Sequence, residues 1–420
     1  MKARRPPVIL TESSPAAAGL DPAGVARAEA VVEDGLCGVY PAAVLLVVRG
    51  GRVATHRAFG HLDPEGKRRP THRDSLFDLA SVSKLFTATA FMALVEAGLV
   101  SLDTPVADVL PAFAGVRRIG ATQDPQTQET VPPDPAYAGQ SVDTRRVTFW
   151  HLLTHTSGLP AWRSLYREGD TAHDVPLPHR VPPAQRARRI GAIYASDFAY
   201  PPGQRIVYSD LGLILLGEAV ARLAGSTGLS RPSLEDYLQR SVLRPLGLGQ
   251  ATYNPLAHGI RPEEIVPTEV CAWRGRRCIG QVHDENAASL GGVAGHAGLF
   301  ATAWEVAVLA QTYLNGGSYG SAQILTPQTV SEMTRPQVNL GDNPRGLGWL
   351  LRSEAGSSSG RWFGPRSYGH TGYTGTSVWV DPDRELVVVL LTNRVYHGRD
   401  PGGIAALRPL LHDAVAEAAQ

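Results

Sequence analysis

A serine and a lysine at helical spacing are the residues of this chain best suited to covalent chemistry. Ser81 and Lys84 form an S-x-x-K sequence, and residues three apart share one face of a helix, so the amine can stand beside the hydroxyl. A desolvated lysine can lose its proton, whereas an arginine cannot. Among 40 basic residues the lysines are Lys2, Lys67 and Lys84, so a lysine at this position is informative. The pattern predicts a serine nucleophile activated by an amine, with a helix N-terminus favouring the alkoxide.

Two further segments give this pair a context. Tyr208-Ser209-Asp210 precedes an apolar run, and His370-Thr371-Gly372 precedes a predicted strand. In this order, S-x-x-K, Y-x-[ND] and [KH]-T-G resemble the serine β-lactamase and penicillin-binding-protein superfamily. Within it the chain is most similar to the branch of class C β-lactamases, DD-peptidases and family VIII esterases. The strings at 151–159 and 291–300 agree with that branch, and the resemblance spans roughly residues 20 to 415.

The resemblance implies a role for each motif residue. Ser81 is expected to form an acyl-enzyme, Lys84 to help deprotonate it, and Tyr208 to serve as the shared general base and acid. A nearby ammonium is expected to lower the pKa of Tyr208 by favouring the phenolate. The oxyanion hole is expected from the backbone N–H groups of Ser81 and Tyr373, as preorganised donors.

Two residues depart from the pattern of the β-lactamases in this branch, and both belong to the expected substrate-binding group of Asp210, His370, Thr371 and Gly372. Asp210 stands where asparagine is usual, so it can only accept hydrogen bonds, from Lys84 or from a substrate N–H. His370 stands where lysine is usual. A largely neutral imidazole supplies a weaker field for a substrate carboxylate and would make the site sensitive to pH. Both departures lower the expected β-lactam turnover.

Several other serine and histidine residues could be considered as catalytic or substrate-binding residues. Ser318 lies in a G-x-S-x-G string but lacks the strand before it and the helix after it, so we expect a loop residue. Ser83 is expected to be structural or a hydrogen-bond partner, His151 and His155 to form core hydrogen bonds, and His296 to fix a tight loop. For the polar cluster His283–Asn286, structural and substrate-contact interpretations both remain open.

The predicted elements imply an α+β protein. Strands are expected over 42–49, 53–59, 346–351, 376–380 and 386–392, and helices over 22–32, 81–97, 211–223, 234–242, 304–314 and 404–418. We therefore expect an antiparallel sheet flanked by helices and built from both termini (residues 1–80 and 290–420), with an inserted, mostly helical domain (81–289) and the active site at their interface. The long Pro-rich stretches 115–146 and 167–183 are expected to shape a cleft or surface.

Composition limits the partners. The net charge is +1 and the arginines are interleaved with acids, which argues against nucleic acid and against an anionic membrane. No apolar leader or membrane span is evident, so the protein is expected to be cytoplasmic and a monomer or weak homo-oligomer. Of the three cysteines, Cys271 and Cys278 flank a predicted hairpin turn. Free buried thiols are expected, with a cross-strand pair as the alternative. No cofactor and no metal are expected.

The sequence therefore predicts a serine hydrolase that acts through an acyl-enzyme on an ester or amide, such as a small acyl ester, a D-amino-acid peptide or a cell-wall-derived compound. A β-lactamase or DD-carboxypeptidase is the alternative of the same class. A non-catalytic acyl-binding or sensor module is the alternative of another class.

Overall fold

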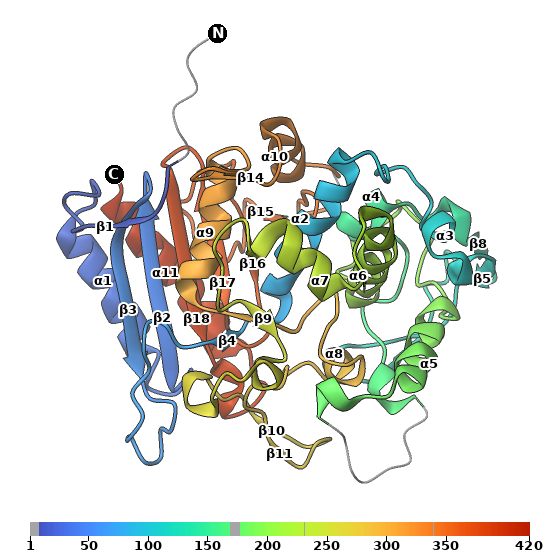
Figure 1. Cartoon of the computed structure of the whole chain (residues 1–420), viewed down its shortest axis with the longest axis horizontal. Coiled ribbons are helices and arrows are strands. Elements are labelled where there is room, and N and C mark those ends of the chain that lie inside the picture. Colours follow the sequence, from blue (N-terminus) through green and yellow to red (C-terminus); the bar gives the residue numbers. More distant parts are fainter. Residues whose placement is uncertain (1–7, 169–176, 231, 339) are drawn as a thin grey trace.

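A large sheet lies on one side of the molecule and a group of helices on the other (Figure 1). The computed structural model describes residues 8–168, 177–230, 232–338 and 340–420. The order of strands in the sheet is β1-β3-β2-β18-β17-β16-β15. Their bounds are β1 (Thr11–Glu12), β2 (Ala42–Arg49), β3 (Arg52–Gly60), β15 (Leu350–Leu351), β16 (Tyr368–Thr371), β17 (Ser377–Asp381) and β18 (Leu386–Thr392).

The two ends of the chain meet in this sheet, because β2 pairs with β18 along its whole length. The pairs are antiparallel apart from β1, which runs parallel to β3. The α+β class and the sheet built from both termini are confirmed, with β1 as a parallel exception. The domain boundaries at residues 80 and 290 stay a prediction.

Both faces of the sheet are buried. Alternate residues of β2 belong to two hydrophobic clusters: Val44, Leu46 and Val48 to one, and Leu45 and Val47 to the other. Helices α1 (Pro22–Asp34) and α11 (Gly402–Ala418) pack together over the second cluster, and α9 (Ala303–Leu314) covers the first. Because both faces are covered, the strands read as continuous apolar runs rather than as alternating ones.

The middle of the chain is mostly helical. The remaining helices are α2 (Ser83–Glu96), α3 (Val106–Val109), α4 (Phe149–Leu153), α5 (Pro183–Tyr194), α6 (Asp210–Ala224), α7 (Leu234–Leu238), α8 (Glu285–Ser289) and α10 (Pro327–Thr334). Helix α2 packs against α6 and α7 and is buried on nearly every side, which its apolar sequence explains. The expected helix over 234–242 is instead a short α-helix that continues as a π-helical turn, Gln239–Leu243.

Short strands complete the fold. One small sheet joins β4 (Phe77–Asp78), β12 (Leu299–Ala301) and β9 (Thr252–Tyr253). The two-stranded ladders are β5 (Val116–Arg118) with β8 (Ser141–Asp143), β6 (Thr122–Gln123) with β7 (Thr130–Val131), β10 (Val270–Cys271) with β11 (Arg276–Arg277), and β13 (Ser318–Tyr319) with β14 (Ala322–Gln323). The stretch 115–146 is thus folded by two of these ladders.

Several expectations need correction or limits. The strand expected over 346–351 is reduced to β15, because Gly348 has a φ of +80° and breaks the extended run. Of the stretch 167–183, residues 169–176 lie outside the described residues. Cys271 and Cys278 are free buried thiols, as expected, and Cys37 is an exposed one. In the part of the chain that the structure describes, no helix has the length and apolar character needed to cross a membrane.

Candidate active site

Ser81 lies in a short 3-10 helix, Ala80–Val82, that leads directly into α2. The residue before it, Ala80, has a φ of +46°, in the left-handed region that a residue with a Cβ avoids. The buried carboxylate of Asp78 holds this turn: Oδ1 accepts the Ala80 N–H at 2.9 Å and Oδ2 accepts the His283 N–H at 2.5 Å. Asp78 is a site residue that the sequence analysis missed.

Lys84 is the centre of the polar cluster. Its Nζ lies 2.8 Å from Ser81 Oγ, 2.8 Å from Asp210 Oδ1 and 3.0 Å from the backbone oxygen of His296. Its side chain is 1% exposed. The helical spacing therefore does place the amine against the hydroxyl, and Asp210, at the start of α6, pairs with that amine.

The protonation of this cluster differs from the expectation. Burial alone would lower the pKa of Lys84, but the charge of Asp210 and the neighbouring Tyr208 outweigh it and raise that pKa. Burial raises the pKa of Tyr208 by more than the Lys84 ammonium lowers it. The Lys84 ammonium thus lowers the pKa of Tyr208 as expected, but burial and the Asp210 carboxylate outweigh it, so the pKa is raised overall. At rest the site holds an ammonium and a neutral phenol.

Tyr208 is held by its neighbours on three sides. Its ring centroid lies 4.6 Å from that of His155, 4.8 Å from Lys84 Nζ and 5.6 Å from the guanidinium carbon of Arg345. His155 Nδ1 accepts the Ser209 N–H at 3.1 Å, so the core hydrogen bond expected for His155 is present. The Tyr208 hydroxyl is buried, and the side chains of Lys84 and Ser81 interact with it.

The turn between β16 and β17 is tied to the segment of the nucleophile. Thr374 Oγ1 donates to the Asp78 carbonyl at 2.8 Å, and Thr376 Oγ1 donates to the Leu79 carbonyl at 2.9 Å. Ser81 and Tyr373 line the same cavity. The oxyanion hole formed by their two N–H groups stays a prediction.

One side of the cleft at Ser81 is basic. We call this cavity of about 370 Å³ the arginine lobe; its wall includes Ser81, Gln126, Tyr208, Arg345, His370, Thr371, Gly372, Tyr373, Arg394 and Arg408. Among the described residues no carboxylate forms a salt bridge with Arg345 or Arg408, whereas the charges of Asp400 and Glu269 act on Arg394. Burial lowers the pKa of Arg345, and burial and the charge of Arg394 lower that of Arg408 to about 9.

The same arginines support the backbone. Arg408 Nη2 donates to the carbonyls of Gly372 and Thr376, and Arg394 Nε donates to that of Tyr373 at 2.7 Å. Burial and the nearby Lys84 charge lower the pKa of His370 to about 3. His370 is therefore neutral, as expected, but it does not make the site sensitive to pH near neutrality. The arginines, which no motif in the sequence marks, supply the positive field that His370 lacks.

The other side of the cleft is acidic. We call this cavity of about 240 Å³ the acidic lobe; its wall includes Ser81, Pro125, Gln126, Gln128, Ala161, Trp162, Tyr208, Asp210, His283, Asp284, Glu285, His296, Tyr373 and Arg399. Residues His283 to Glu285 thus face the cavity, which favours the substrate-contact interpretation for them. Asn286 instead donates to the Arg163 carbonyl at 2.8 Å and is structural. Residues 125–128 confirm that the stretch 115–146 shapes part of the cleft.

The competing serines lie in structural positions. Ser318 sits in the β13–β14 hairpin and its hydroxyl donates to Gln323 at 2.8 Å. Ser83 Oγ accepts the Leu299 N–H at 3.2 Å. His151 Nδ1 accepts the Thr148 N–H at 3.2 Å as part of a capping box on α4. Ser83 and His151 behave as expected. Ser318 lies in a strand of a hairpin rather than in the loop that was expected, and its role is structural.

A half-buried serine and tyrosine that meet at a buried lysine, beside two charged lobes, are the arrangement of a serine hydrolase that uses lysine and tyrosine at its nucleophile. The Beta-lactamase family model matches residues 28–411, so the chain belongs to this family. A relative from Escherichia coli (strain K12), named "Putative D-alanyl-D-alanine carboxypeptidase", is 30% identical and covers 92% of this chain and 86% of its own length.

Two solved structures share the fold. EstCE1, described as a hydrolase with promiscuous acyltransferase activity, has a TM-score of 0.67 at 21% identity over 94% of this chain and 98% of its own. The octameric penicillin-binding protein homologue from Pyrococcus abyssi has a TM-score of 0.63 at 21% identity, over 91% and 75%. The chain is a serine hydrolase of this superfamily, whose chemistry proceeds through an acyl-enzyme on an ester or amide.

Proposed function

We propose that this enzyme hydrolyses an amide or ester whose leaving group carries a carboxylate, as in the release of a terminal amino acid from a short peptide. The observation that supports this proposal is the arginine lobe beside Ser81. Buried guanidinium groups without a carboxylate partner are costly, and a bound carboxylate offsets that cost. The name of the Escherichia coli relative supports the same substrate class.

In the proposed acylation, Ser81 Oγ attacks the carbonyl carbon while its proton passes to Lys84. Lys84 is already an ammonium, so it passes one of its own protons to Asp210, 2.8 Å away. The backbone N–H groups of Ser81 and Tyr373 stabilise the oxyanion.

Tyr208, a neutral phenol, then donates its proton to the leaving nitrogen as the C–N bond breaks. Lys84 returns a proton to the phenolate and recovers its own from Asp210, so the charges at the end equal those at rest. Water takes the place of the leaving group, and the same groups release the acid product and restore Ser81.

The test compares N-acetyl-D-alanyl-D-alanine with its C-terminal amide, by release of the leaving residue. We expect the carboxylate form to be the better substrate. Arg345→Gln should lower kcat/KM for it by about 10-fold, as the loss of one charge-assisted contact predicts. The exposed Arg366→Gln, remote from the cleft, is the matched control. Equal turnover of acid and amide by the wild type would contradict the proposal.

The location and assembly proposed are those expected from the sequence: cytoplasmic, and a monomer or weak homo-oligomer. Cell fractionation and light scattering on the purified chain test them. A stable octamer, as in the Pyrococcus abyssi homologue, would contradict the second.

A further inference from the structure

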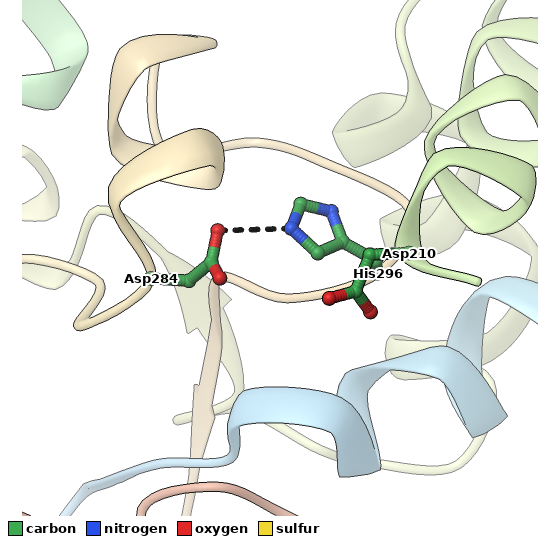
Figure 2. A group of neighbouring side chains, drawn as sticks. All are labelled: Asp210, Asp284 and His296. Carbon is green, nitrogen blue, oxygen red and sulfur yellow. Dashed lines mark hydrogen bonds and ion pairs between the residues drawn. The ribbon is translucent and has the colours of Figure 1, made fainter. Parts of the chain in front are cut away.

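Asp284 occupies a fixed position in the wall of the acidic lobe. Its Oδ1 accepts the Ala287 N–H at 2.7 Å, as the N-cap of α8, and the His296 Nε2–H at 2.9 Å (Figure 2). Arg274 donates to the backbone carbonyls of His283 and Asp284 at 3.1 and 3.3 Å. Side chain and backbone are both immobilised, so the carboxylate is preorganised at the edge of the cavity.

The charges around this carboxylate are unequally paired. Asp210 pairs with Lys84, and Glu285 pairs with Arg399, so each has a permanently charged partner. Asp284 has the imidazoles of His296 and His283 as its neighbours of opposite charge. Its Oδ2 receives no hydrogen bond from the residues that the structure describes, and its side chain is 25% exposed. A carboxylate accepts up to about four hydrogen bonds, so Asp284 retains capacity for a donor from the cavity.

The cavity that this oxygen faces is the catalytic one. Ser81 and Tyr208 line the same space. Pro125, Ala161 and Trp162 form an apolar wall there. An indole face attracts an organic cation, and methylene groups pack against such a wall.

We propose that Asp284 selects a protonated amine on the acyl part of the substrate. The proposal rests on the proposed function, because the arginine lobe then holds the leaving group and leaves the acidic lobe to the acyl group. The substrate class is an aminoacyl ester or amide: positive on one side of the scissile bond and negative on the other.

A metal ion is the competing occupant. Ligand atoms of Asp210, Asp284 and His296 lie within 4.8 Å of one another (Figure 2). The Lys84 ammonium already pairs with Asp210 at 2.8 Å and would repel a divalent cation. An organic ammonium that binds Asp284 Oδ2 does not need Asp210. The structure therefore favours the amine.

The test uses p-nitrophenyl esters, whose leaving group carries no carboxylate. At two chain lengths an aminoacyl ester is compared with the ester in which methyl replaces ammonium: 3-aminopropanoyl with butanoyl, and 6-aminohexanoyl with heptanoyl. We expect a preference for the ammonium of about 10-fold in kcat/KM at one length or both, after correction for spontaneous hydrolysis. Asp284→Asn should bring the ratio close to one, since asparagine keeps the N-cap and the size.

Two control variants locate the effect. Asp21→Asn changes the N-cap of α1, far from the cleft, and should keep the wild-type ratio. Glu263→Gln, at an exposed glutamate that pairs with Arg261, should also keep the wild-type ratio. A preference for methyl at both lengths, or a preference for ammonium that survives in Asp284→Asn, overturns the proposal.

A binding measurement makes the test independent of turnover. Butylammonium chloride should bind the wild-type protein by calorimetry and bind Asp284→Asn about 10-fold more weakly. Absence of butylammonium binding to the wild type overturns the proposal, as does abolition of ester selectivity by EDTA, which would indicate a metal. Equal turnover of N-acetyl-D-alanyl-D-alanine and its C-terminal amide, while butylammonium binding and the ester selectivity hold, would count against the proposed function alone.

Discussion

The two lobes of the cleft meet at Ser81 and solve opposite electrostatic problems. In the arginine lobe, Arg345 is half-buried and Arg408 is buried, and neither has a carboxylate partner among the described residues, so burial lowers their pKa values. In the acidic lobe, Asp210 and Glu285 have charged partners and Asp284 has a histidine. One lobe carries an uncompensated charge at large cost, while the other carries a nearly compensated one.

This difference indicates how strongly each lobe should depend on the substrate. A lobe with unpaired buried charge gains much when a counter-ion arrives, because desolvation has already been incurred in folding. A lobe in which one carboxylate oxygen accepts no hydrogen bond gains a single contact when the substrate binds. We therefore expect the carboxylate of the leaving group to contribute mainly to binding, and the amine of the acyl group mainly to discrimination.

The largest effect is expected from removing the Ser81 hydroxyl, because Ser81 lies in the wall of both lobes. Ser81→Ala should lower hydrolysis of a p-nitrophenyl ester by roughly 10⁴-fold or more and abolish labelling by a fluorophosphonate. Ser318→Ala is the control, since that hydroxyl only bonds Gln323 in a hairpin. The intact mass of each variant after incubation with the fluorophosphonate shows whether it is labelled. A labelled Ser81→Ala together with an unlabelled Ser318→Ala would move the nucleophile elsewhere.

A smaller effect separates two acids of the same lobe. Asp210→Asn removes the partner of Lys84 and should lower kcat/KM by about 10-fold for cationic and neutral esters alike. Asp284→Asn, in contrast, should act on the cationic ester. Because an amide can donate a hydrogen bond, Asp210→Asn should also raise nitrocefin turnover relative to ester turnover, which in the wild type we expect to favour the ester. An equal loss of kcat/KM in Asp210→Asn and Asp284→Asn, for the cationic and the neutral ester alike, would contradict separate roles for the two carboxylates.

The smallest effect concerns His370 and pH. Because burial lowers the pKa of His370 to about 3, His370→Gln should leave no change in the pH dependence of kcat/KM between pH 5.5 and 8. The low pKa of His370 instead makes the free energy of unfolding depend on pH. The unfolded chain takes up a proton near the ordinary pKa of about 6.5 and the folded one does not, so stability from this group is complete above that value and is lost as pH falls toward 3.

The melting temperature measured from pH 7 to pH 4 checks this. The wild type should lose more stability on acidification than His370→Gln. A pH–rate limb near 6 that disappears in the variant would show that His370 titrates in the active enzyme, against the burial argument.

The part of the site that sequence could predict is the part carried by local motifs. Ser81, Lys84, Tyr208 and Asp210 lie in short strings whose spacing has chemical meaning, and the structure brings them together. Arg345, Arg394 and Arg408 lie in separate segments that only the sheet and α11 bring to one cavity. Nothing marks them in the sequence, because arginine stands for nearly every basic residue of this chain.

The fold shows the same division. Strands β2 and β18 were predictable because unbroken apolar runs report burial on both faces. Strand β15 is shorter than expected because a glycine with positive φ interrupts a favourable pattern. The effect of the Lys84 ammonium on the pKa of Tyr208 was predictable, but the larger opposite effect of burial was not, because a motif does not show that the phenol hydroxyl is buried.

The left-handed backbone of Ala80 bears on how this protein could be made more stable. Glycine adopts a φ of +46° with little steric penalty, and alanine gives up roughly 1 kcal/mol or more there. Ala80→Gly is therefore a substitution that a search for thermostable variants would retain. The glycine would also make the turn that positions Ser81 more flexible. Selection for heat resistance alone would therefore favour a variant with lower catalytic activity.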